Sequence, residues 1–348
     1  MPSVWPRRSG SGPRTVSPVP SRPGGTVPHR SRTEDGGGVG PGSECCVVLG
    51  GTGWVGRHVC EAFARHGYRV LAVARKNPEH PVGHDFLSLD LAGASVRTVH
   101  GVLADARADV VVNATDAANA TDGWDRSEAE LRVANVRMVA RLVEAAASVP
   151  RRPRLVHIGT IHEYGPIRDH TSVTESAVPR PVNAYARTKL EGSRTVLAAA
   201  RSGEVDAVVL RLVNVCGPHP SPASFPGKLL ALLREAAAGG RPELRVADSM
   251  RDWLDVRDAA AATLSAARHP VSGHTFNVGS GVAVHTRELV ALGLRAAGLA
   301  ASAVVERGGP VSSLGADWIQ ADVRKAAALL GWSPRIGLAR SLRDMWEG

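Results

Sequence analysis

Short, continuous apolar runs alternate with longer segments of helical periodicity along most of this chain. Runs of this length are typical of strands that are buried on both faces of a parallel sheet. The longer segments carry apolar residues three or four positions apart, which predicts helices that cover the sheet. The expected strands are 45–49, 69–74, 109–113, 154–158, 207–213 and 275–278, and the clearest helices are 54–66, 128–147 and 185–200.

This alternation predicts a doubly wound α/β fold with a parallel, Rossmann-like sheet, because right-handed crossovers place helices on both of its faces. We expect residues 44–216 to form a dinucleotide-binding domain, with 251–280 returning to it. The pattern loosens after residue 217. Segments 217–250 and 281–348 are therefore expected to form a smaller substrate-binding lobe.

Residues 1–43 differ from the rest in composition. They hold 8 Pro, 9 Gly and 7 Ser without a periodic apolar pattern, and they contribute +4 to the formal net charge of +9. Such a stretch cannot bury enough apolar surface to offset its ordering entropy, so we expect a disordered leader. Arg7-Arg8 is not followed by an apolar run, which argues against export and favours a cytoplasmic protein.

The formal charge of +9 would suit a nucleic-acid partner, but other features of the composition argue against one. Only four of the 42 basic residues are lysines, and aromatic residues make up 4% without clustering. No apolar run is long enough to cross a membrane, so no membrane partner is expected. The four cysteines lack metal-ligand spacing, so we expect reduced thiols and no metal site.

A glycine-rich turn follows the first expected strand. Gly50-Gly51-Thr52-Gly53-Trp54-Val55-Gly56 has the spacing G-x-x-G-x-x-G and opens a helix. Glycines permit the tight turn and let backbone N–H groups approach a pyrophosphate, whose charge the helix N-terminus favours. A plain strand-to-helix turn is the alternative, but the strand–loop–helix context favours dinucleotide binding. The expected contacts are Gly50, Thr52, Gly53, Trp54, Val55 and Gly56.

The end of the second strand indicates which dinucleotide binds. NAD-binding folds usually place an acid there for the ribose 2′-hydroxyl, whereas this chain has Ala74 followed by Arg75 and Lys76. Two cations could pair with a 2′-phosphate, so NADP(H) is favoured over NAD(H), unless both side chains simply belong to a solvated turn. Asp90 could bond the adenine amine or be an ordinary loop aspartate. The expected cofactor-binding set also includes Leu91, Asn113, Ala114, Thr115, Tyr185 and Lys189.

Tyr185 and Lys189 lie four residues apart at the start of an expected helix and share one of its faces. A tyrosine must lower its pKa from about 10 towards 7 to exchange protons usefully, a change of about 4 kcal/mol to which a nearby ammonium contributes. By itself the pair could be an ordinary helix-surface pair. Thr160 ends an apolar strand 25 residues earlier and gives the pair a catalytic context.

With these residues in place, the sequence resembles the extended short-chain dehydrogenase/reductase family, in its branch of sugar-nucleotide epimerases and dehydratases. The resemblance runs from about residue 44 to residue 347. Besides the glycine loop, Thr160 and the Tyr–Lys pair, it rests on Leu210-Arg211-Leu212-Val213-Asn214-Val215-Cys216-Gly217-Pro218, Arg251-Asp252-Trp253-Leu254-Asp255-Val256-Arg257-Asp258, Phe276-Asn277-Val278-Gly279-Ser280-Gly281 and Leu330-Gly331-Trp332-Ser333-Pro334.

The resemblance implies a role for each catalytic candidate. Tyr185 would be the general acid/base, and Lys189 would bond the nicotinamide ribose and tune Tyr185. Thr160 would hydrogen-bond the reacting oxygen. Asn113 and Asn135 would be structural or relay positions.

The resemblance also implies substrate contacts. Asn214 and Arg251 match positions that contact the diphosphate of a nucleotide sugar, and an arginine suits that anion because its fork donates two parallel hydrogen bonds. Arg251 could instead form a surface pair with Asp252 or Asp255. The proline-rich loop 217–227 is expected to gate the sugar pocket.

Two departures from the family pattern narrow the reaction. Dehydratases follow the catalytic threonine with Asp-Glu, whereas this chain has Ile161 and His162, which argues against 4,6-dehydration because Ile161 cannot transfer a proton. His162 would be a proton relay or a substrate hydrogen-bond donor, or else an ordinary histidine at a strand end. Many epimerases carry another diphosphate-binding arginine near Ser312-Ser313; here there is none, and Arg307 is the candidate replacement.

These features favour an NADPH-dependent ketoreductase that acts on a nucleotide-linked keto sugar. The leading substrate is a dTDP-4-keto-6-deoxyhexose from antibiotic or cell-surface sugar pathways. An NDP-sugar epimerase with bound NAD is the first alternative, and a non-catalytic NAD(P)-binding regulatory or scaffold protein is the second. By analogy with the family, a homodimer would form through 128–147 and 183–200.

Overall fold

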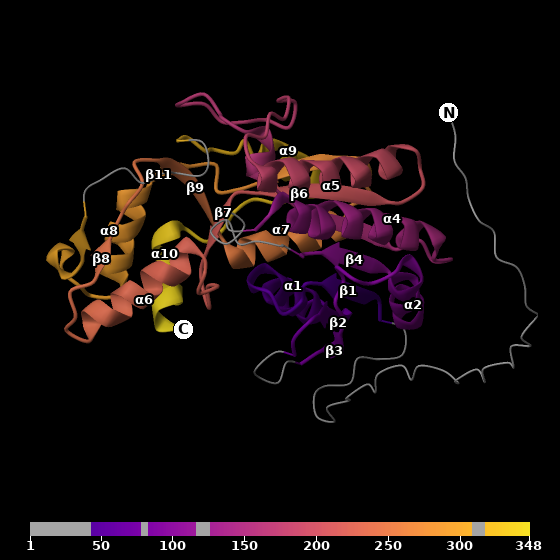
Figure 1. Ribbon diagram of the computed structural model, residues 1–348, viewed down its shortest axis with the longest axis horizontal. Coiled ribbons are helices and arrows are strands. Elements are labelled where there is room, and N and C mark those ends of the chain that lie inside the picture. The colour runs from indigo at the N-terminus through magenta and orange to yellow at the C-terminus, as the bar shows by residue number, and fades with distance from the viewer. Residues whose placement is uncertain (1–42, 78–82, 116–125, 308–316) are drawn as a thin grey trace, which may run out of the picture. The chain divides into compact units, whose positions relative to one another are not determined.

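A seven-stranded, fully parallel sheet forms the centre of the computed structural model, which describes residues 43–77, 83–115, 126–307 and 317–348 (Figure 1). The leader predicted at 1–43 therefore lies, except for its last residue, outside the described residues. The strand order is β10-β6-β5-β4-β1-β2-β3. The bounds are β10 Thr275–Val278, β6 Ala207–Leu212, β5 Arg154–Thr160, β4 Val110–Asn113, β1 Cys45–Leu49, β2 Arg69–Ala74 and β3 Asp85–Ser88.

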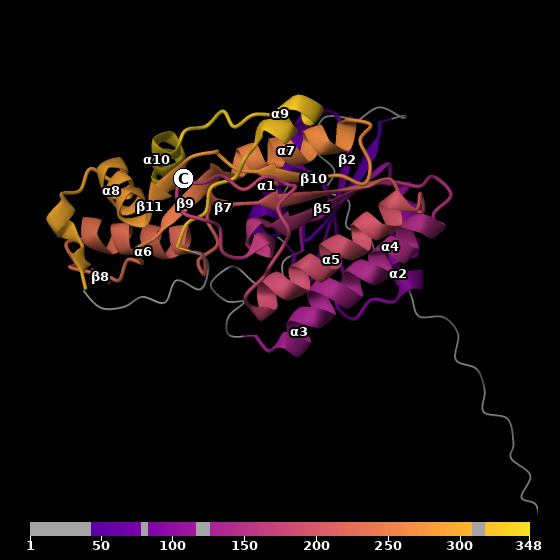
Figure 2. The same cartoon turned by 90° about the horizontal axis from the view of Figure 1, so that it is seen from above.

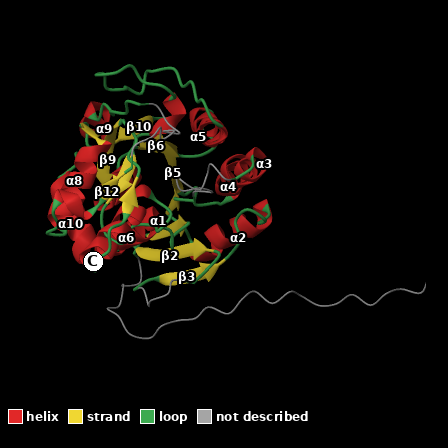
Figure 3. Ribbon diagram, turned by 60° about the vertical axis from the view of Figure 1, so that its left-hand side comes forward, coloured by secondary structure: helices red, strands yellow, loops and turns green. Residues whose placement is uncertain are grey.

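Helices cover both faces of this sheet (Figures 2 and 3). Along β1, Cys46 and Val48 pack into one apolar cluster, while Val47 and Leu49 pack into the other. The first cluster includes α1 Trp54–Arg65, α7 Val256–Arg268 and α9 Arg324–Leu330, and the second includes α2 Val96–Ala106, α4 Met138–Ser148 and α5 Ala184–Arg201. This arrangement confirms the predicted doubly wound parallel fold.

The helix expected over 128–147 is not a uniform α-helix. It begins as α3 Glu128–Arg132, passes through a π-helical turn over Val133–Arg137 and continues as α4. The turn adjoins α5, where Asn135 donates a side-chain hydrogen bond to Thr188 Oγ1 at 3.0 Å. A Cβ added at Gly192 of α5 would lie 2.3 Å from the Asn135 carbonyl oxygen. Glycine is therefore required here for the close approach of two backbones.

Gly192→Ala is expected to lower the free energy of unfolding by about 1–3 kcal/mol, because the added methyl group must displace backbone rather than a flexible side chain. Urea unfolding measures the change. Gly101→Ala in α2 is the matched control, since a Cβ there meets nothing within 4 Å and should stabilise the helix by up to about 1 kcal/mol. Equal stabilities of the Gly192 variant and the wild type would contradict the close approach.

Most elements after β6, apart from α7, β10 and α9, form a second, smaller set. A three-stranded sheet has the order β11-β9-β7, and a short pair joins β12 and β8. Helices α6, α8 and α10 surround a third apolar cluster that includes Leu229, Leu289 and Leu342. The bounds are β7 Asn214–Cys216, α6 Phe225–Ala237, β8 Glu243–Leu244, β9 Met250–Asp255, β11 Ala283–His285, α8 Thr286–Ala296, β12 Val305–Glu306 and α10 Leu338–Glu347.

Two strands that the sequence prediction associated with the dinucleotide-binding domain belong to this second sheet. β7 leaves the central sheet directly after β6, and β9 pairs with it in parallel. Only α7 and β10, from the segment 251–280, return to the central sheet.

No helix within the described ranges has the length and apolar character needed to cross a bilayer. All four cysteines are buried and free. Among the described residues, no group of three or more His, Cys, Asp and Glu is suited to hold a metal ion.

Candidate active site

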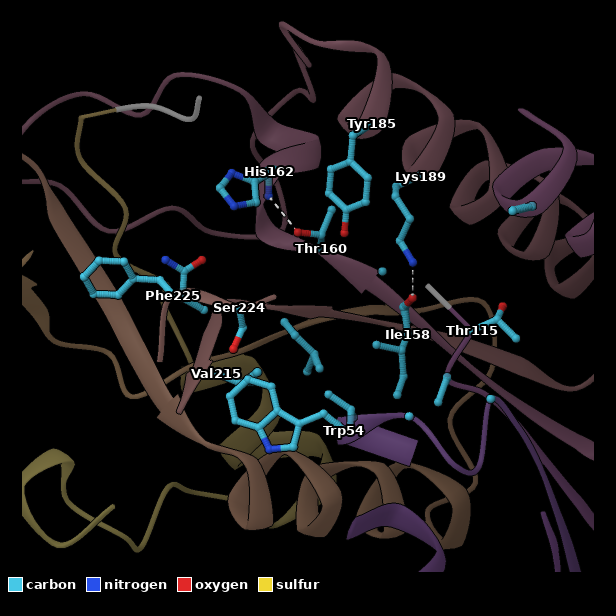
Figure 4. Close-up of a pocket in the computed structure, with 18 of the residues that line it drawn as sticks. Trp54, Thr115, Ile158, Thr160, His162, Tyr185, Lys189, Val215, Ser224 and Phe225 are labelled. Carbon is cyan, nitrogen blue, oxygen red and sulfur yellow. Dashed lines mark hydrogen bonds between the residues drawn. The ribbon is translucent and has the colours of Figure 1, made fainter. Parts of the chain in front are cut away.

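A cavity of about 710 Å³ lies at the carboxyl ends of the central strands and is lined by residues from both sets of elements (Figure 4). The strand order reverses between β1 and β4, and crevices at such a reversal are the usual ligand sites of open α/β sheets. Among the described lining residues Asp90 is the only carboxylate, whereas six are cationic: Arg75, Lys76, Arg126, Lys189, Arg245 and Arg251. The cavity is therefore suited to anionic ligands.

The glycine loop forms one wall of this cavity. Gly50 has a φ of +79°, and a Cβ there would lie 2.8 Å from the Ala114 carbonyl oxygen. Thr52, Gly53, Trp54 and Val55, which were expected to contact the dinucleotide, also line the cavity. Gly56 does not belong to the described lining; its missing side chain lets α1 pack on the loop, since a Cβ would lie 2.1 Å from the Gly50 carbonyl oxygen. The narrow loop at a helix N-terminus fits a dinucleotide pyrophosphate.

The other predicted cofactor residues mostly line the same cavity. Arg75, Lys76, Asp90, Leu91, Ala114 and Thr115 belong to the lining. Asn113 is fully buried behind it: its Oδ1 accepts hydrogen bonds from Thr115 Oγ1 at 2.6 Å and Thr115 N at 3.2 Å. Its Nδ2 donates to His157 Nδ1 at 3.0 Å. Asn113 therefore supports the wall rather than forming it.

The three catalytic candidates meet in the cavity (Figure 4). Tyr185 and Lys189 project from the first turns of α5, whose N-cap Asn183 accepts a hydrogen bond from Ala186 N. Lys189 Nζ donates to the Ile158 carbonyl oxygen at 2.9 Å, and the side chain is 3% exposed. Thr160 is the last residue of β5. Figure 4 shows the Tyr185 hydroxyl directed towards Thr160.

A buried ion pair that the sequence analysis did not identify supports Thr160. Glu163 Oε2 pairs with Arg211 Nε at 2.7 Å. Glu163 Oε1 accepts hydrogen bonds from Thr160 N at 3.1 Å and from Ser193 Oγ at 2.8 Å. Burial disfavours the Arg211 cation and is the largest single influence, but Glu163 and Tyr164 together outweigh it and raise the pKa of Arg211. Thr160 and Glu163 have the T-x-x-E spacing of a capping box, so their contact could have been predicted from the sequence.

The residues predicted for the substrate also face this cavity. His162, Asn214 and Arg251 all belong to its lining. Desolvation and the charge of Arg251 lower the pKa of His162 to about 4, although a side-chain hydrogen bond with Asn214 acts in the opposite direction. Desolvation also lowers the pKa of Arg251 to about 10. At neutral pH the site therefore presents an uncharged imidazole beside a cationic guanidinium.

His162→Gln should change how stability depends on acidity. Between pH 6.5 and pH 4 the unfolded chain protonates this histidine while the native state keeps it neutral, so stability falls as the pH falls through that window. The variant should lose that contribution, which is at most about 3 kcal/mol because one pKa unit corresponds to 1.36 kcal/mol. Urea unfolding of both proteins at pH 7 and pH 4.5 checks it. An identical pH dependence in the two proteins would contradict the lowered pKa.

The two positions after Thr160 differ in exposure to the cavity. Ile161 is 1% exposed and packs in the apolar core, so neither its chemistry nor its placement can serve proton transfer. His162 is half-buried and faces the cavity.

Arg307 does not provide the additional arginine expected of it. Its Nε pairs with Glu243 Oε2 at 2.5 Å across the β8–β12 pair, and it is absent from the described lining. Residues 312 and 313 lie outside the described residues. Arg245 and Arg126, which the sequence analysis did not single out, line the cavity instead.

Comparisons with known proteins agree with this geometry. The model of the NAD dependent epimerase/dehydratase family matches residues 46–279. dTDP-6-deoxy-L-talose 4-dehydrogenase (NAD(P)(+)) of Kitasatospora kifunensis is 35% identical over 303 residues, covering 86% of this chain and 94% of that protein. MoeE5 in complex with UDP-glucose and NAD has a TM-score of 0.75 at 26% identity, covering 87% of this chain and 97% of its own. UDP-glucose 4-epimerase of Thermus thermophilus with NAD has a TM-score of 0.77 at 23% identity, covering 87% and 98%, and supports the fold.

Proposed function

The chain belongs to the NAD dependent epimerase/dehydratase family of nucleotide-sugar enzymes, and from that premise we propose that it reduces a nucleotide-linked keto sugar with NADPH. The proposed substrate is a dTDP-4-keto-6-deoxyhexose, reduced at C4. The observation that carries the proposal is the convergence of Thr160, Tyr185 and Lys189 in one cavity that also contains the glycine loop and Arg251.

Tyr185, Thr160 and Lys189 each have a separate role in the proposed reduction. When bound, the dinucleotide supplies the hydride that reduces the carbonyl carbon. Tyr185 donates its phenolic proton to the carbonyl oxygen, so that one hydride and one proton together convert ketone to alcohol. Thr160 holds that oxygen by a hydrogen bond from its hydroxyl group. The buried ammonium of Lys189 favours the tyrosinate left behind.

The residues after Thr160 favour this reaction over water elimination. A dehydration needs one group to remove a carbon-bound proton and another to protonate the leaving hydroxyl. Ile161 has no ionisable group, and His162, whose pKa is about 4, is uncharged at neutral pH and lacks the proton that a general acid would deliver to the leaving hydroxyl. His162 and Asn214 can instead orient sugar hydroxyl groups through neutral hydrogen bonds, while Arg251 binds the diphosphate.

The name of the Kitasatospora relative describes oxidation at C4 of a dTDP-6-deoxy sugar. An enzyme accelerates a reaction and its reverse equally, so a 4-dehydrogenase is a 4-ketoreductase when the keto sugar and reduced coenzyme are in excess. This relative therefore supports the carbon, the nucleotide and the type of sugar proposed. The coenzyme preference rests separately on Arg75 and Lys76, which line the cavity where an NAD-specific site would place an acid.

The test is turnover of dTDP-4-keto-6-deoxyglucose with NADPH and, in parallel, with NADH. The expected result is stoichiometric loss of coenzyme absorbance, faster with NADPH, and a product two hydrogens heavier by mass spectrometry. An isomer formed without coenzyme consumption would replace the proposal with the NAD-dependent epimerase. Coenzyme binding without turnover of this substrate or of its UDP counterpart would favour a non-catalytic protein.

A further inference from the structure

The first turn of α1 is hydrogen-bonded to the loop that follows β7. Trp54 Nε1 donates to the Pro218 carbonyl oxygen at 3.0 Å. His58 Nε2 also contacts this oxygen, at 3.3 Å, and Arg57 donates to the neighbouring His219 carbonyl oxygen at 2.5 Å. Three side chains from the start of one helix thus contact two adjacent backbone carbonyls about 160 residues away in the sequence.

One end of this contact lines the cavity, and the other lies in a loop between two segments that line it. Trp54 follows the glycine loop directly and lines the cavity together with Gly53 and Val55. The loop leads from β7, which contributes Asn214 and Val215 to the lining, to the N-terminus of α6, which contributes Phe225. Trp54, Val215 and Ser224, all labelled in Figure 4, line the same cavity.

The loop itself has little freedom to absorb a displacement. Gly217 and His219 both have positive φ angles, of +120° and +50°. Ser224 caps α6 and donates both N–H and hydroxyl to the Ser221 carbonyl oxygen. A Cβ added at Gly227 would lie 2.0 Å from that same oxygen, so the loop is packed tightly on α6. The end of this loop is therefore held against the first turn of α6, next to Phe225.

We infer that Trp54 and Arg57 couple the two halves of the cavity, so that an occupied dinucleotide site raises the affinity for the nucleoside diphosphate of the substrate. This inference rests on the proposed function, since it assumes that both ligands share the cavity. Coupling of this kind is reciprocal, so the substrate must raise coenzyme affinity by the same factor. Trp54 is a positioning residue in this role, because the indole N–H acts through the loop and a phenylalanine would lack it.

The experiment is a binding cycle on the full chain. Calorimetry first measures NADP⁺, NAD⁺, dTDP and UDP singly, and the tighter nucleotide of each kind is then titrated with the other present. The wild type should show a coupling factor within the range of about 5–150-fold that is typical of allosteric pairs. In Trp54→Phe the factor, normalised to that variant's own single affinities, should fall close to one.

Two further variants test whether a loss of coupling is specific to the contact between α1 and the loop after β7. Arg57→Met removes the second donor from a side chain outside the described lining, so it should weaken the coupling while the dinucleotide alone binds as in the wild type. Trp332→Phe is the matched control, because its indole donates to the Asp258 carbonyl oxygen at 3.1 Å away from the cavity lining. It should keep the full coupling factor.

The experiment distinguishes failure of the proposed function from failure of the coupling inference. If no dinucleotide binds, the proposed function falls. If both ligands bind and the wild-type factor is one, or if Trp54→Phe and Arg57→Met keep the wild-type factor, the coupling inference is overturned while the proposed function stands.

Discussion

Replacing Tyr185 with phenylalanine is expected to lower kcat by about 10²–10⁴-fold, the usual contribution of a positioned general acid. The variant retains the aromatic ring that packs against Leu131 in the small apolar cluster beneath α5, so the fold should persist. The change removes the phenolic hydroxyl, and with it the proton that would neutralise the emerging alkoxide. Coenzyme affinity should change little, because the glycine loop and Lys189 remain in place.

Steady-state kinetics with the keto sugar and NADPH measures this loss, and calorimetry measures the coenzyme affinity. Tyr164→Phe is the matched control: Tyr164 is also buried, and its hydroxyl donates to Asn277 Oδ1 at 2.9 Å, outside the described cavity lining. That variant should lose about 1 kcal/mol of stability and keep most of its kcat. If Tyr185→Phe were as active as Tyr164→Phe, Tyr185 could not be the general acid.

The central sheet could be predicted from the sequence because each of its strands is a local signal. Cys45–Leu49, Arg69–Ala74 and Thr275–Val278 coincide with the expected strands, since a strand buried on both faces forms a nearly continuous apolar run. The second sheet could not be predicted this way. β7 and β11 are three residues long and only partly buried, and their pairing with β9 depends on contacts between distant segments.

In the candidate site, too, local sequence motifs could be predicted and long-range contacts could not. The glycine loop and the Tyr185–Lys189 pair are defined by spacing within a single turn or loop, and the structure places them in one cavity. Arg307 was expected there and pairs instead with Glu243, because strand pairing between β8 and β12 sets its position. Arg211 was read as part of a motif without a role, since its partner Glu163 lies 48 residues away.

The buried Glu163–Arg211 pair leads to a prediction about stability. Glu163→Gln should lower the free energy of unfolding by about 3–5 kcal/mol, because it leaves the guanidinium of Arg211, 4% exposed, without a compensating charge. Chemical denaturation measures the change. Glu191→Gln is the control, since it breaks a surface pair with Arg132 whose side chains are about two-fifths exposed, and it should cost about 0–1 kcal/mol.

The double variant Glu163→Gln/Arg211→Met separates the charge from the geometry. If the cost of Glu163→Gln arises from an uncompensated buried cation, removing the cation as well should restore part of the lost stability. The glutamine amide oxygen can still accept the hydrogen bonds from Thr160 N and Ser193 Oγ, so Thr160 should stay in place in both variants. A double variant less stable than Glu163→Gln would show that Arg211 stabilises the fold chiefly by packing over the Tyr164 ring, which lies 4.3 Å from its guanidinium.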